Sequence, residues 1–453
     1  MDNLQLTFHG AAGTVTGARF LVEGRGTRLL LDGGLFQGLG AAERNHPRPP
    51  ASWTRLDGVI LSHAHLDHSG YLPVLVRAGY RSAIHCTHAT ADMVALILRD
   101  AARLQREAAR RDGLDDELYD EDDIEQLLSQ IVTHAYGATF PVGALEARLR
   151  RAGHILGSAT IELREPQADV ATLLYSGDLG RARHPMLRAP DDAPGARTLL
   201  VESTYGDRIH PADPLTALAD EINRVVDRGG SIVIPTFAIG RAQEILWHLR
   251  RLEDDRRIPT LPVVLDSPMA IDATDLFCRF PEEHNLEMEA LMDARRCPLC
   301  CTRFEMSRTP EESRRLARRH GPVIILAGSG MVTGGRVGRH LARLLPDRRN
   351  GVLFVGFQAR GTPGRALVDG AEQIELGGEP VPVRASIASI GGLSAHADAP
   401  EIIEWLHRWT NAPAHTYVVH GEPEAASAMA NRITTELAWP ATVAELGAEV
   451  NLP

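Results

Sequence analysis

The segment HAHLDH at residues 63–68 constrains this chain more than any other feature. An apolar stretch precedes it and predicts a strand, and residues two apart in a strand point to one side. His63 and His65 can therefore bind one ion, while Asp67 and His68 lie where the chain turns and can bind a second. Imidazole and carboxylate ligands without thiolate favour zinc, or another borderline divalent metal, in a hydrolytic site.

A single histidine at a strand end is more often a satisfied polar side chain than a metal ligand. Four potential ligands packed this closely are different, because they would repel one another or lack partners if buried without an ion. The cluster therefore predicts a metal site.

The composition is that of an ordinary globular protein. The chain has 453 residues, enough for two or three domains, and its 44% apolar content supports normal cores. It contains no run of about 18 apolar residues, so no membrane span is expected. Its first residues lack the basic and apolar regions of a signal peptide, which predicts a cytoplasmic location.

All 48 basic residues are arginines. The absence of lysine excludes Schiff-base chemistry and a Walker-type phosphate loop. The net charge is −11, whereas a nonspecific nucleic-acid binder would more often be basic. Any polyanionic substrate should therefore be held by local arginines and by metal charge.

The cysteines are too few and too scattered for a disulfide framework. Cys297 and Cys300 form a CxxC pattern that Cys301 extends, but a structural zinc normally needs four ligands and the chain has no second cysteine pair. We expect free thiols here rather than a metal site.

The N-terminal part predicts strands separated by glycine-rich turns, with further strands near residues 56–62 and 83–86. A helix is expected near residues 69–78. Residues 88–132 are expected to be helical, with the acidic stretch 112–123 in a solvated helical hairpin.

Strands and helices alternate from about residue 205 to residue 385, which predicts a parallel sheet with crossover helices. Histidine-containing motifs reappear after that segment, so one domain inserted in another fits better than a tandem pair. We expect residues 1–204 and 386–453 to form one domain and residues 205–385 to form the insert.

Further polar side chains can complete the metal site. His154 lies near glycines, Asp178 follows a buried strand, and His396 and His420 stand at probable strand ends. Singly, such residues are common turn features, but two metals about 3.5–4 Å apart need about six to eight ligands, often with one bridging carboxylate. The expected ligands are His63, His65 and His154 for the first ion, Asp67, His68 and His420 for the second, and Asp178 with a hydroxide between them.

These motifs resemble those of a known superfamily. Asp32, the HAHLDH segment, His154 and Asp178 resemble the motifs of the metallo-β-lactamase superfamily. Glu202, His396 and His420 resemble three additional motifs of its β-CASP branch. That branch contains nucleic-acid nucleases with an inserted second domain. Four further segments resemble those of RNA-processing members of this branch, such as the endonuclease subunit of the cleavage and polyadenylation factor. They are Phe36–Gly38, Ser267–Met269, Gly328–Met331 and Gly356–Thr362.

The resemblance implies an α/β fold, in which a metallo-β-lactamase αββα sandwich carries a β-CASP domain built on a parallel sheet with flanking helices. It also implies roles for single residues. Asp32 would orient a ligand histidine. Asp67, His396 and Glu202 would be catalytic, with His396 protonating the leaving oxygen or binding the scissile phosphate and Glu202 holding His396 in place.

Substrate phosphates would be held by the cleft and the inserted domain, because we expect no separate RNA-binding domain at either end of the chain. Arginines beside glycine-containing turns suit this role, although ordinary surface arginines are as common. The candidates are Arg241, Arg336, Arg360 and Arg365. Aromatic residues make up 5% of the chain, so base stacking is less expected as the main grip.

The function expected from this resemblance is that of a ribonuclease with two Zn²⁺ per chain. It would hydrolyse phosphodiester bonds of single-stranded RNA, as an endonuclease, a 5′-exonuclease or both, by attack of the bridging hydroxide. One alternative is a hydrolase of a small lactone or thioester, which would not need the insert or the pair formed by Glu202 and His396. Another is a non-catalytic scaffold subunit, although such relatives typically lose metal ligands. The resemblance also implies a homodimer.

Overall fold

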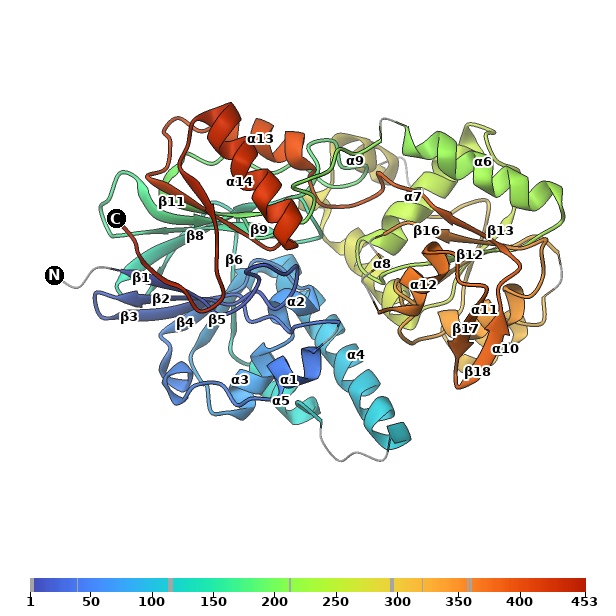
Figure 1. The fold of residues 1–453 in the computed structure, drawn as a ribbon, viewed down its shortest axis with the longest axis horizontal. Coiled ribbons are helices and arrows are strands. Elements are labelled where there is room, and N and C mark those ends of the chain that lie inside the picture. Colours follow the sequence, from blue (N-terminus) through green and yellow to red (C-terminus); the bar gives the residue numbers. More distant parts are fainter. Residues whose placement is uncertain are drawn as a thin grey trace. The chain divides into compact units, whose positions relative to one another are not determined.

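The computed structural model describes residues 4–38, 40–112, 117–211, 213–293, 297–319, 321–356, 358 and 361–453. The chain divides into two compact units, one formed by Met1–Ile209 with His396–Pro453 and the other by His210–Ala395 (Figure 1). We expect the insert at residues 205–385, and the second unit begins and ends slightly later in the chain, at His210 and Ala395.

Two seven-stranded sheets form the framework of the first unit. The first sheet has the order β22 (Glu449–Asn451), β1 (Gln5–Phe8), β2 (Phe20–Gly24), β3 (Thr27–Leu31), β4 (Gly58–Ile60), β5 (Ala83–Thr87) and β6 (Ile131–His134). The second has the order β21 (Ala441–Val443), β20 (His415–Val419), β11 (Ala196–Glu202), β10 (Ala171–Tyr175), β9 (Ala159–Arg164), β8 (Leu145–Arg151) and β7 (Thr139–Val142).

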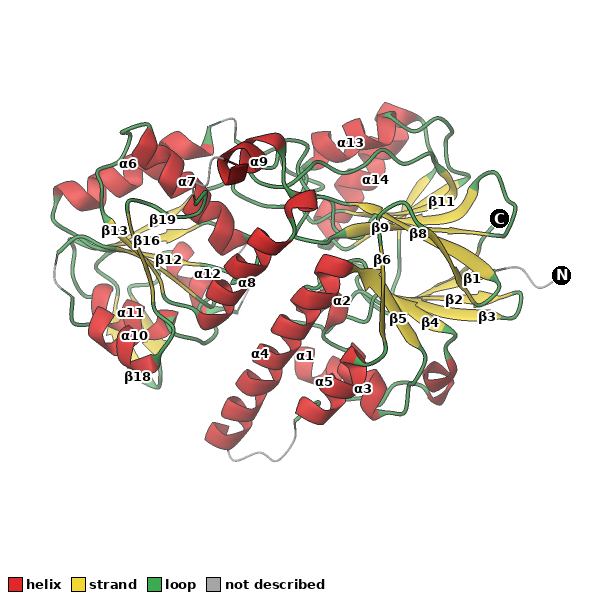
Figure 2. Cartoon of the chain, turned by 180° about the vertical axis from the view of Figure 1, so that it is seen from behind, coloured by secondary structure: helices red, strands yellow, loops and turns green. Residues whose placement is uncertain are grey.

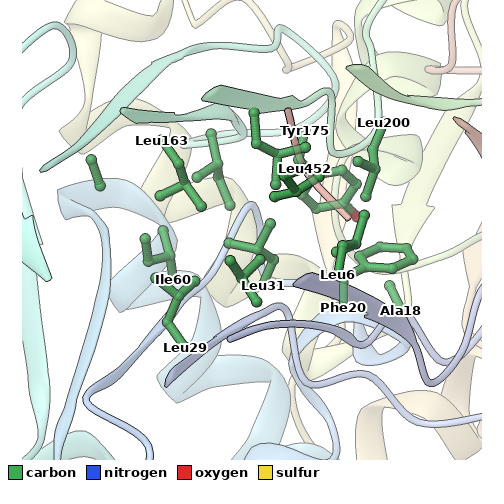
Figure 3. Packing of buried hydrophobic residues seen from close by; sticks show 14 of the residues in the cluster. Leu6, Ala18, Phe20, Leu29, Leu31, Ile60, Leu163, Tyr175, Leu200 and Leu452 are labelled. Carbon is green, nitrogen blue, oxygen red and sulfur yellow. The ribbon is translucent and has the colours of Figure 1, made fainter. Parts of the chain in front are cut away.

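The two sheets share one apolar core (Figure 3). Leu31 and Ile60 enter it from the first sheet, and Leu163 and Leu200 enter it from the second. Every residue of β4 and β10 is buried, as expected for strands covered on both faces. Each fully buried leucine or isoleucine side chain contributes about 1.5–3 kcal/mol to folding, so this core holds the two sheets together.

Helices cover the outer faces of the two sheets (Figure 2). The helix α4 (His88–Asp112) contacts β5 and β6 of the first sheet. The helices α13 (Ala399–His407) and α14 (Pro423–Leu437) share a second apolar cluster with the other sheet, in which Ile402 and Ile433 accompany Leu199. The order helix, sheet, sheet, helix confirms the expected αββα sandwich.

Parallel pairing gathers polar strand ends at one edge. The strands β10, β11 and β20 are parallel neighbours, so their carboxyl ends point the same way. Asp178 follows β10, Glu202 is the last residue of β11, and His420 follows β20. In the other sheet β4 is parallel to β3 and β5, and it leads directly into the HAHLDH segment.

A six-stranded sheet with parallel pairing throughout forms the second unit. Its order is β14 (Arg303–Met306), β13 (Pro262–Leu265), β15 (Ile324–Ala327), β12 (Ile232–Pro235), β16 (Gly351–Phe354) and β19 (Ser386–Ser389). Its main helices are α6 (Pro214–Asp227), α7 (Arg241–Asp254), α8 (Pro268–Arg279), α9 (Leu286–Asp293), α10 (Pro310–Leu316), α11 (Val337–Leu344) and α12 (Pro363–Val368), and a hairpin of β17 (Gln373–Leu376) and β18 (Glu379–Pro382) precedes β19. The expected parallel sheet with flanking helices is confirmed.

The helices α4 and α5 (Glu121–Leu128) form the helical hairpin expected within residues 88–132, and the expectation of helix is wrong at the end of that range. After α5 the chain enters β6. Strand formation prevails at Ile131 because β6 gains parallel pairing with β5 at the end of the sheet. The helix expected near residues 69–78 is also divided, into α2 (Leu66–Ser69) and α3 (Leu72–Arg77).

The acidic stretch 112–123 has a local structural role in its second half. Residues 113–116 lie outside the described residues. Asp120 begins α5 through a capping box with Asp123, and both carboxylates form ion pairs with Arg77. The solvated hairpin is therefore anchored to α3 by charge.

The expectation of free thiols is wrong for two of the cysteines. Cys297 and Cys300 form a disulfide, while Cys86, Cys278 and Cys301 are free. The Arg250 guanidinium donates to the carbonyl oxygens of Cys297 and Cys300, the two residues that the disulfide joins.

No helix in the described ranges is long and apolar enough to cross a membrane.

Candidate metal centre

The HAHLDH segment is held by close backbone contacts with the turn that follows β3 and with the residues that precede β2. The Gly33 N–H donates to the His68 carbonyl over 2.7 Å, and the Ala18 N–H donates to the Asp67 carbonyl over 2.8 Å. A Cβ atom at Gly34 would lie 1.6 Å from the Asp67 carbonyl oxygen. Glycine is therefore required there, and it lets the two loops touch.

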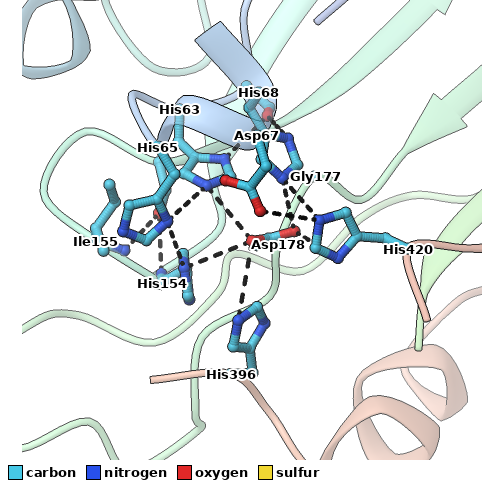
Figure 4. Close-up of polar contacts among 12 residues, drawn as sticks. His63, His65, Asp67, His68, His154, Ile155, Gly177, Asp178, His396 and His420 are labelled. Atoms are coloured by element: carbon cyan, nitrogen blue, oxygen red, sulfur yellow. Dashed lines mark hydrogen bonds and ion pairs between the residues drawn. The ribbon is translucent and has the colours of Figure 1, made fainter. Parts of the chain in front are cut away.

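A first group of ligand atoms comes from His63, His65, His154 and Asp178 (Figure 4). His65 Nδ1 lies 3.1 Å from His63 Nε2 and 3.3 Å from His154 Nε2. The carboxylate oxygen Oδ2 of Asp178 lies 3.4 Å from His63 Nε2 and 3.6 Å from His154 Nε2. These atoms therefore surround one small volume.

A second group comes from Asp67, His68 and His420. His420 Nε2 lies 3.0 Å from His68 Nε2 and 3.6 Å from Asp67 Oδ2. The other oxygen of Asp178, Oδ1, lies 3.3 Å from His68 Nε2 and 3.5 Å from His420 Nδ1. The two oxygens of Asp178 thus face different groups, as Figure 4 shows.

The spacing of these atoms fits divalent metal ions. Four ligands at about 2.0–2.1 Å from a tetrahedral zinc ion lie about 3.3–3.4 Å from one another, and the four distances given for the first group, from 3.1 to 3.6 Å, lie around this value. Asp178 is 2% exposed, yet its Oδ1 accepts no hydrogen bond from the described residues. A buried carboxylate oxygen without a hydrogen bond is costly unless a cation compensates it.

Burial and charge set the protonation of these side chains. Burial holds the pKa of His63 and of His154 well below the usual value, and it lowers the pKa of His65 to about 4. Their nitrogen lone pairs are therefore available to a metal ion. Burial also opposes a charged His68, but the carboxylates of Asp178 and Asp32 raise its pKa well above the usual value. The second group thus attracts positive charge.

A carboxylate–imidazole pair adjoins the first group. His396 Nδ1 lies 3.1 Å and 3.2 Å from the two carboxylate oxygens of Glu202. Glu202 is itself fixed, because its Oε1 accepts a hydrogen bond of 2.6 Å from the Leu179 N–H. His396 Nε2 lies 4.0 Å from Asp178. Burial disfavours the charged imidazole, but the carboxylates of Glu202 and Asp178 prevail and raise the pKa of His396 to about 8.

The expectation that His396 stands at a strand end is wrong. The strand β19 ends at Ser389, and His396 lies in the following loop, where it forms an isolated bridge with Gly180. The Ala397 N–H donates to the Leu179 carbonyl over 2.8 Å. The histidine is therefore positioned by the loop that follows Asp178 rather than by a strand of its own.

Several hydroxyl groups at the centre were not foreseen from the sequence. Ser62 and Tyr175 both donate to Asp32, which in turn accepts from His68 Nδ1 over 2.7 Å. The Thr204 hydroxyl lies 3.0 Å from His420 Nδ1. The one available signal was position, because Ser62 immediately precedes the HAHLDH segment.

Three of the arginines expected to hold phosphate are engaged with carboxylates in the second unit. Arg241 pairs with Glu244, Arg336 pairs with Asp266, and Arg365 pairs with Asp369, while Arg360 lies outside the described residues. A phosphate-binding role for these residues stays a prediction.

Family models match most of the chain. The metallo-beta-lactamase superfamily model matches residues 15–152, the Beta-Casp domain model matches residues 242–367, and the model of a Zn-dependent metallo-hydrolase RNA specificity domain matches residues 380–444. The first match contains ligand residues of both groups, the third contains His420 of the second group, and His154 and Asp178 lie outside the matched ranges.

Whole-chain comparisons agree with these matches. The chain is 37% identical over 417 residues to ribonuclease TTHA0252 of Thermus thermophilus, covering 92% of each protein. It is 32% identical over 434 residues to the transcription termination factor FttA of Methanocaldococcus jannaschii, covering 92% of this chain and 67% of FttA. A solved structure of a protein of unknown function from Enterococcus faecalis shares the fold, with a TM-score of 0.56, 14% identity and coverage of 99% and 100% of the two chains. The chain belongs to the β-CASP branch of the metallo-β-lactamase superfamily, a family of metal-dependent hydrolases.

Proposed function

We propose that this protein is a zinc-dependent ribonuclease that hydrolyses phosphodiester bonds of single-stranded RNA. The observation that carries the proposal is the position of Asp178. One of its oxygens faces each ligand group, and the pair formed by Glu202 and His396 stands beside it. The names of the two relatives, a ribonuclease and a transcription termination factor, support RNA as the substrate.

Two zinc ions are proposed to be held by the residues of the two groups. His63, His65 and His154 would hold one ion, Asp67, His68 and His420 would hold the other, and Asp178 would bridge them. When bound, such ions lower the pKa of a water molecule to near neutrality and neutralise charge on the phosphate oxygens.

The remaining chemistry belongs to the side chains of this protein. His396 carries a proton on Nε2 and gives it to the departing 3′ oxygen of the RNA, which leaves a 5′-phosphate on the other product. Glu202 accepts from His396 Nδ1, so it orients the ring and favours the protonated form. Asp67 supports the reaction as a ligand oxygen of the second group.

The test uses purified protein of measured zinc content and single-stranded RNA labelled at the 5′ or the 3′ end, with DNA of the same sequence as control. We expect cleavage of RNA and not of DNA. Internal fragments would identify an endonuclease, and release of 5′ mononucleotides would identify a 5′-exonuclease. Intact RNA after incubation with zinc-loaded protein would contradict the proposal. The cytoplasmic location and the homodimer stay predictions.

A further inference from the structure

A buried cluster of hydroxyl groups surrounds the Asp32 carboxylate behind the second ligand group. Its Oδ2 accepts from the Tyr175 hydroxyl over 2.8 Å, from Ser62 Oγ over 2.7 Å and from His68 Nδ1 over 2.7 Å. Its Oδ1 accepts from the Ser62 N–H over 2.7 Å. Asp32, Ser62 and His68 are 0% exposed and Tyr175 is 1% exposed, so the protein itself supplies the hydrogen bonds that water would otherwise make.

Tyr175 is held in this cluster by a strand in the middle of the sheet. Its strand, β10, is buried throughout and pairs on both sides, antiparallel with β9 and parallel with β11. Its ring packs against the edge of Phe20, with 5.1 Å between the ring centres. The phenol oxygen is therefore a fixed point, and a phenylalanine would keep the packing while losing that oxygen.

Asp32 depends on such a fixed point. Its backbone has a φ of 57°, in the left-handed region that non-glycine residues rarely adopt. Its carboxylate is the contact through which the imidazole of His68 is oriented, and His68 presents its other nitrogen to His420. Loss of one donor would leave a buried carboxylate oxygen less satisfied and its orientation less restricted, and the orientation of the His68 ring would be less restricted with it.

We propose that Tyr175 is a positioning residue for the ion of the second ligand group. It fixes Asp32, Asp32 fixes His68, and His68 binds the ion. The hydroxyl makes its contacts with Asp32 and, at 3.5 Å, with His68 Nδ1, both of them on the side of the ring that faces away from His420. The inference rests on the metal sites of the proposed function.

The test is titration of Zn²⁺ into metal-free protein in the presence of a competing chelator. Tyr175→Phe should bind one of the two ions about 10-fold less tightly than the wild type, at the lower limit of the 10–100-fold loss that follows removal of a group supporting a metal ligand. The other ion should bind as in the wild type. RNA cleavage should fall at limiting zinc and recover at excess zinc.

Tyr80→Phe is the matched control. Tyr80 is 0% exposed in the same unit, and its hydroxyl donates to the Ala83 carbonyl over 2.7 Å. This variant also loses one buried hydrogen bond, but it should bind both zinc ions with wild-type affinity. An equal loss of zinc affinity in the two variants, or none in Tyr175→Phe, would overturn the proposal.

A double-mutant cycle tests the path through Asp32. Asp32→Asn should weaken zinc binding, and adding Tyr175→Phe to it should cause no further loss. A full additional loss would show that Tyr175 acts elsewhere and would overturn the inference. Wild-type protein that binds no zinc would overturn this inference and the proposed function together. Wild-type protein that binds two zinc ions and leaves RNA intact would overturn the ribonuclease alone, and the zinc affinities would still decide the role of Tyr175.

Discussion

At the scale of single residues, the side chains of the metal centre combine neutral imidazoles with an anionic carboxylate, and a cation would balance that negative charge. Burial keeps His63 and His154 neutral, so each offers a lone pair. Asp178 remains anionic because the neighbouring histidines outweigh the effect of burial and hold its pKa well below the usual range. The neutral imidazoles of His63 and His154 beside a buried carboxylate are ligands that zinc prefers in hydrolytic sites.

His396 can be separated from metal binding by substitution. His396→Ala should keep the zinc content of the wild type and lower kcat by about 10²–10⁴-fold, because it removes a general acid and no metal ligand. His415→Ala is the control. It also removes a histidine near the ligand His420 in sequence, but one that bonds to Thr442 at the surface. Zinc analysis and RNA cleavage rates check both variants. A kcat for His396→Ala within about threefold of the wild type would contradict a role in proton transfer.

The metal-ligand residues could be predicted from the sequence, whereas the residues that hydrogen-bond to them and hold them in place could not. His63, His65 and His68 stand in one short segment whose chemistry is unusual enough to be recognised. Tyr175 stands in an apolar strand that resembles any core strand. Its contact with Asp32 joins residues far apart in the chain and exists only after the two sheets have packed.

At the scale of elements, a buried charge network fixes the carboxyl end of β13. Asp266 is 0% exposed and accepts from His340 Nε2 over 2.6 Å, from Ser313 Oγ over 2.7 Å and from Arg336 over 2.7 Å. Burial opposes its charge, but these donors prevail and lower its pKa below the usual range. The network joins α10 and α11 to the sheet.

The Asp266→Asn variant should be less stable than the wild type by about 3–5 kcal/mol at pH 7, because it leaves the Arg336 guanidinium without its buried carboxylate partner. The folded-state pKa of Asp266 is depressed, so its contribution is complete above the unfolded value of about 3.9 and is lost as the pH falls through the folded value. The difference between variant and wild type should therefore be constant near neutrality and shrink in acid.

Urea unfolding as a function of pH measures this difference. Asp369→Asn is the control, because Asp369 forms an exposed ion pair with Arg365 that contributes at most about 1 kcal/mol. A destabilisation that stayed unchanged down to the acid limit of folding would contradict the ionised network.

Elements with a simple apolar pattern were predictable, and short or paired ones were not. The strand β12 is a continuous apolar run, which is the pattern of buried parallel strands, and β10 is buried throughout with one threonine in its apolar sequence. The strand β6 has exposed residues at its centre, and its first two residues fall within the range expected to be helical, because its stability comes from pairing with β5 rather than from its own pattern. Local sequence does not report such pairing.

At the scale of the whole molecule, the ligands join distant parts of the chain. His63 follows β4, Asp178 follows β10, and His420 follows β20 near the end of the first unit. Ions held by these residues would link the beginning, middle and end of that unit, and a ligand that binds only the folded state stabilises it. The interrupted order of domains was predictable because histidine-containing motifs occur on both sides of the insert.

Chelation should therefore lower the melting temperature of the first unit by several degrees, since a ligand present at about 1,000 times its Kd contributes about 4 kcal/mol. Re-addition of zinc should reverse the change, and His154→Ala should reduce the response. Differential scanning calorimetry with and without chelator provides the measurement. Identical melting curves would contradict metal sites within the folded core.

The central claim is that two zinc ions at this centre hydrolyse RNA, and zinc content measured together with RNA cleavage on one preparation tests it most directly. We predict two zinc ions per chain and cleavage of single-stranded RNA in the wild type, with loss of zinc and of cleavage in Asp178→Ala. Wild-type cleavage rates in an Asp178→Ala protein, or a wild-type protein that carries its zinc and leaves RNA intact, would contradict the account.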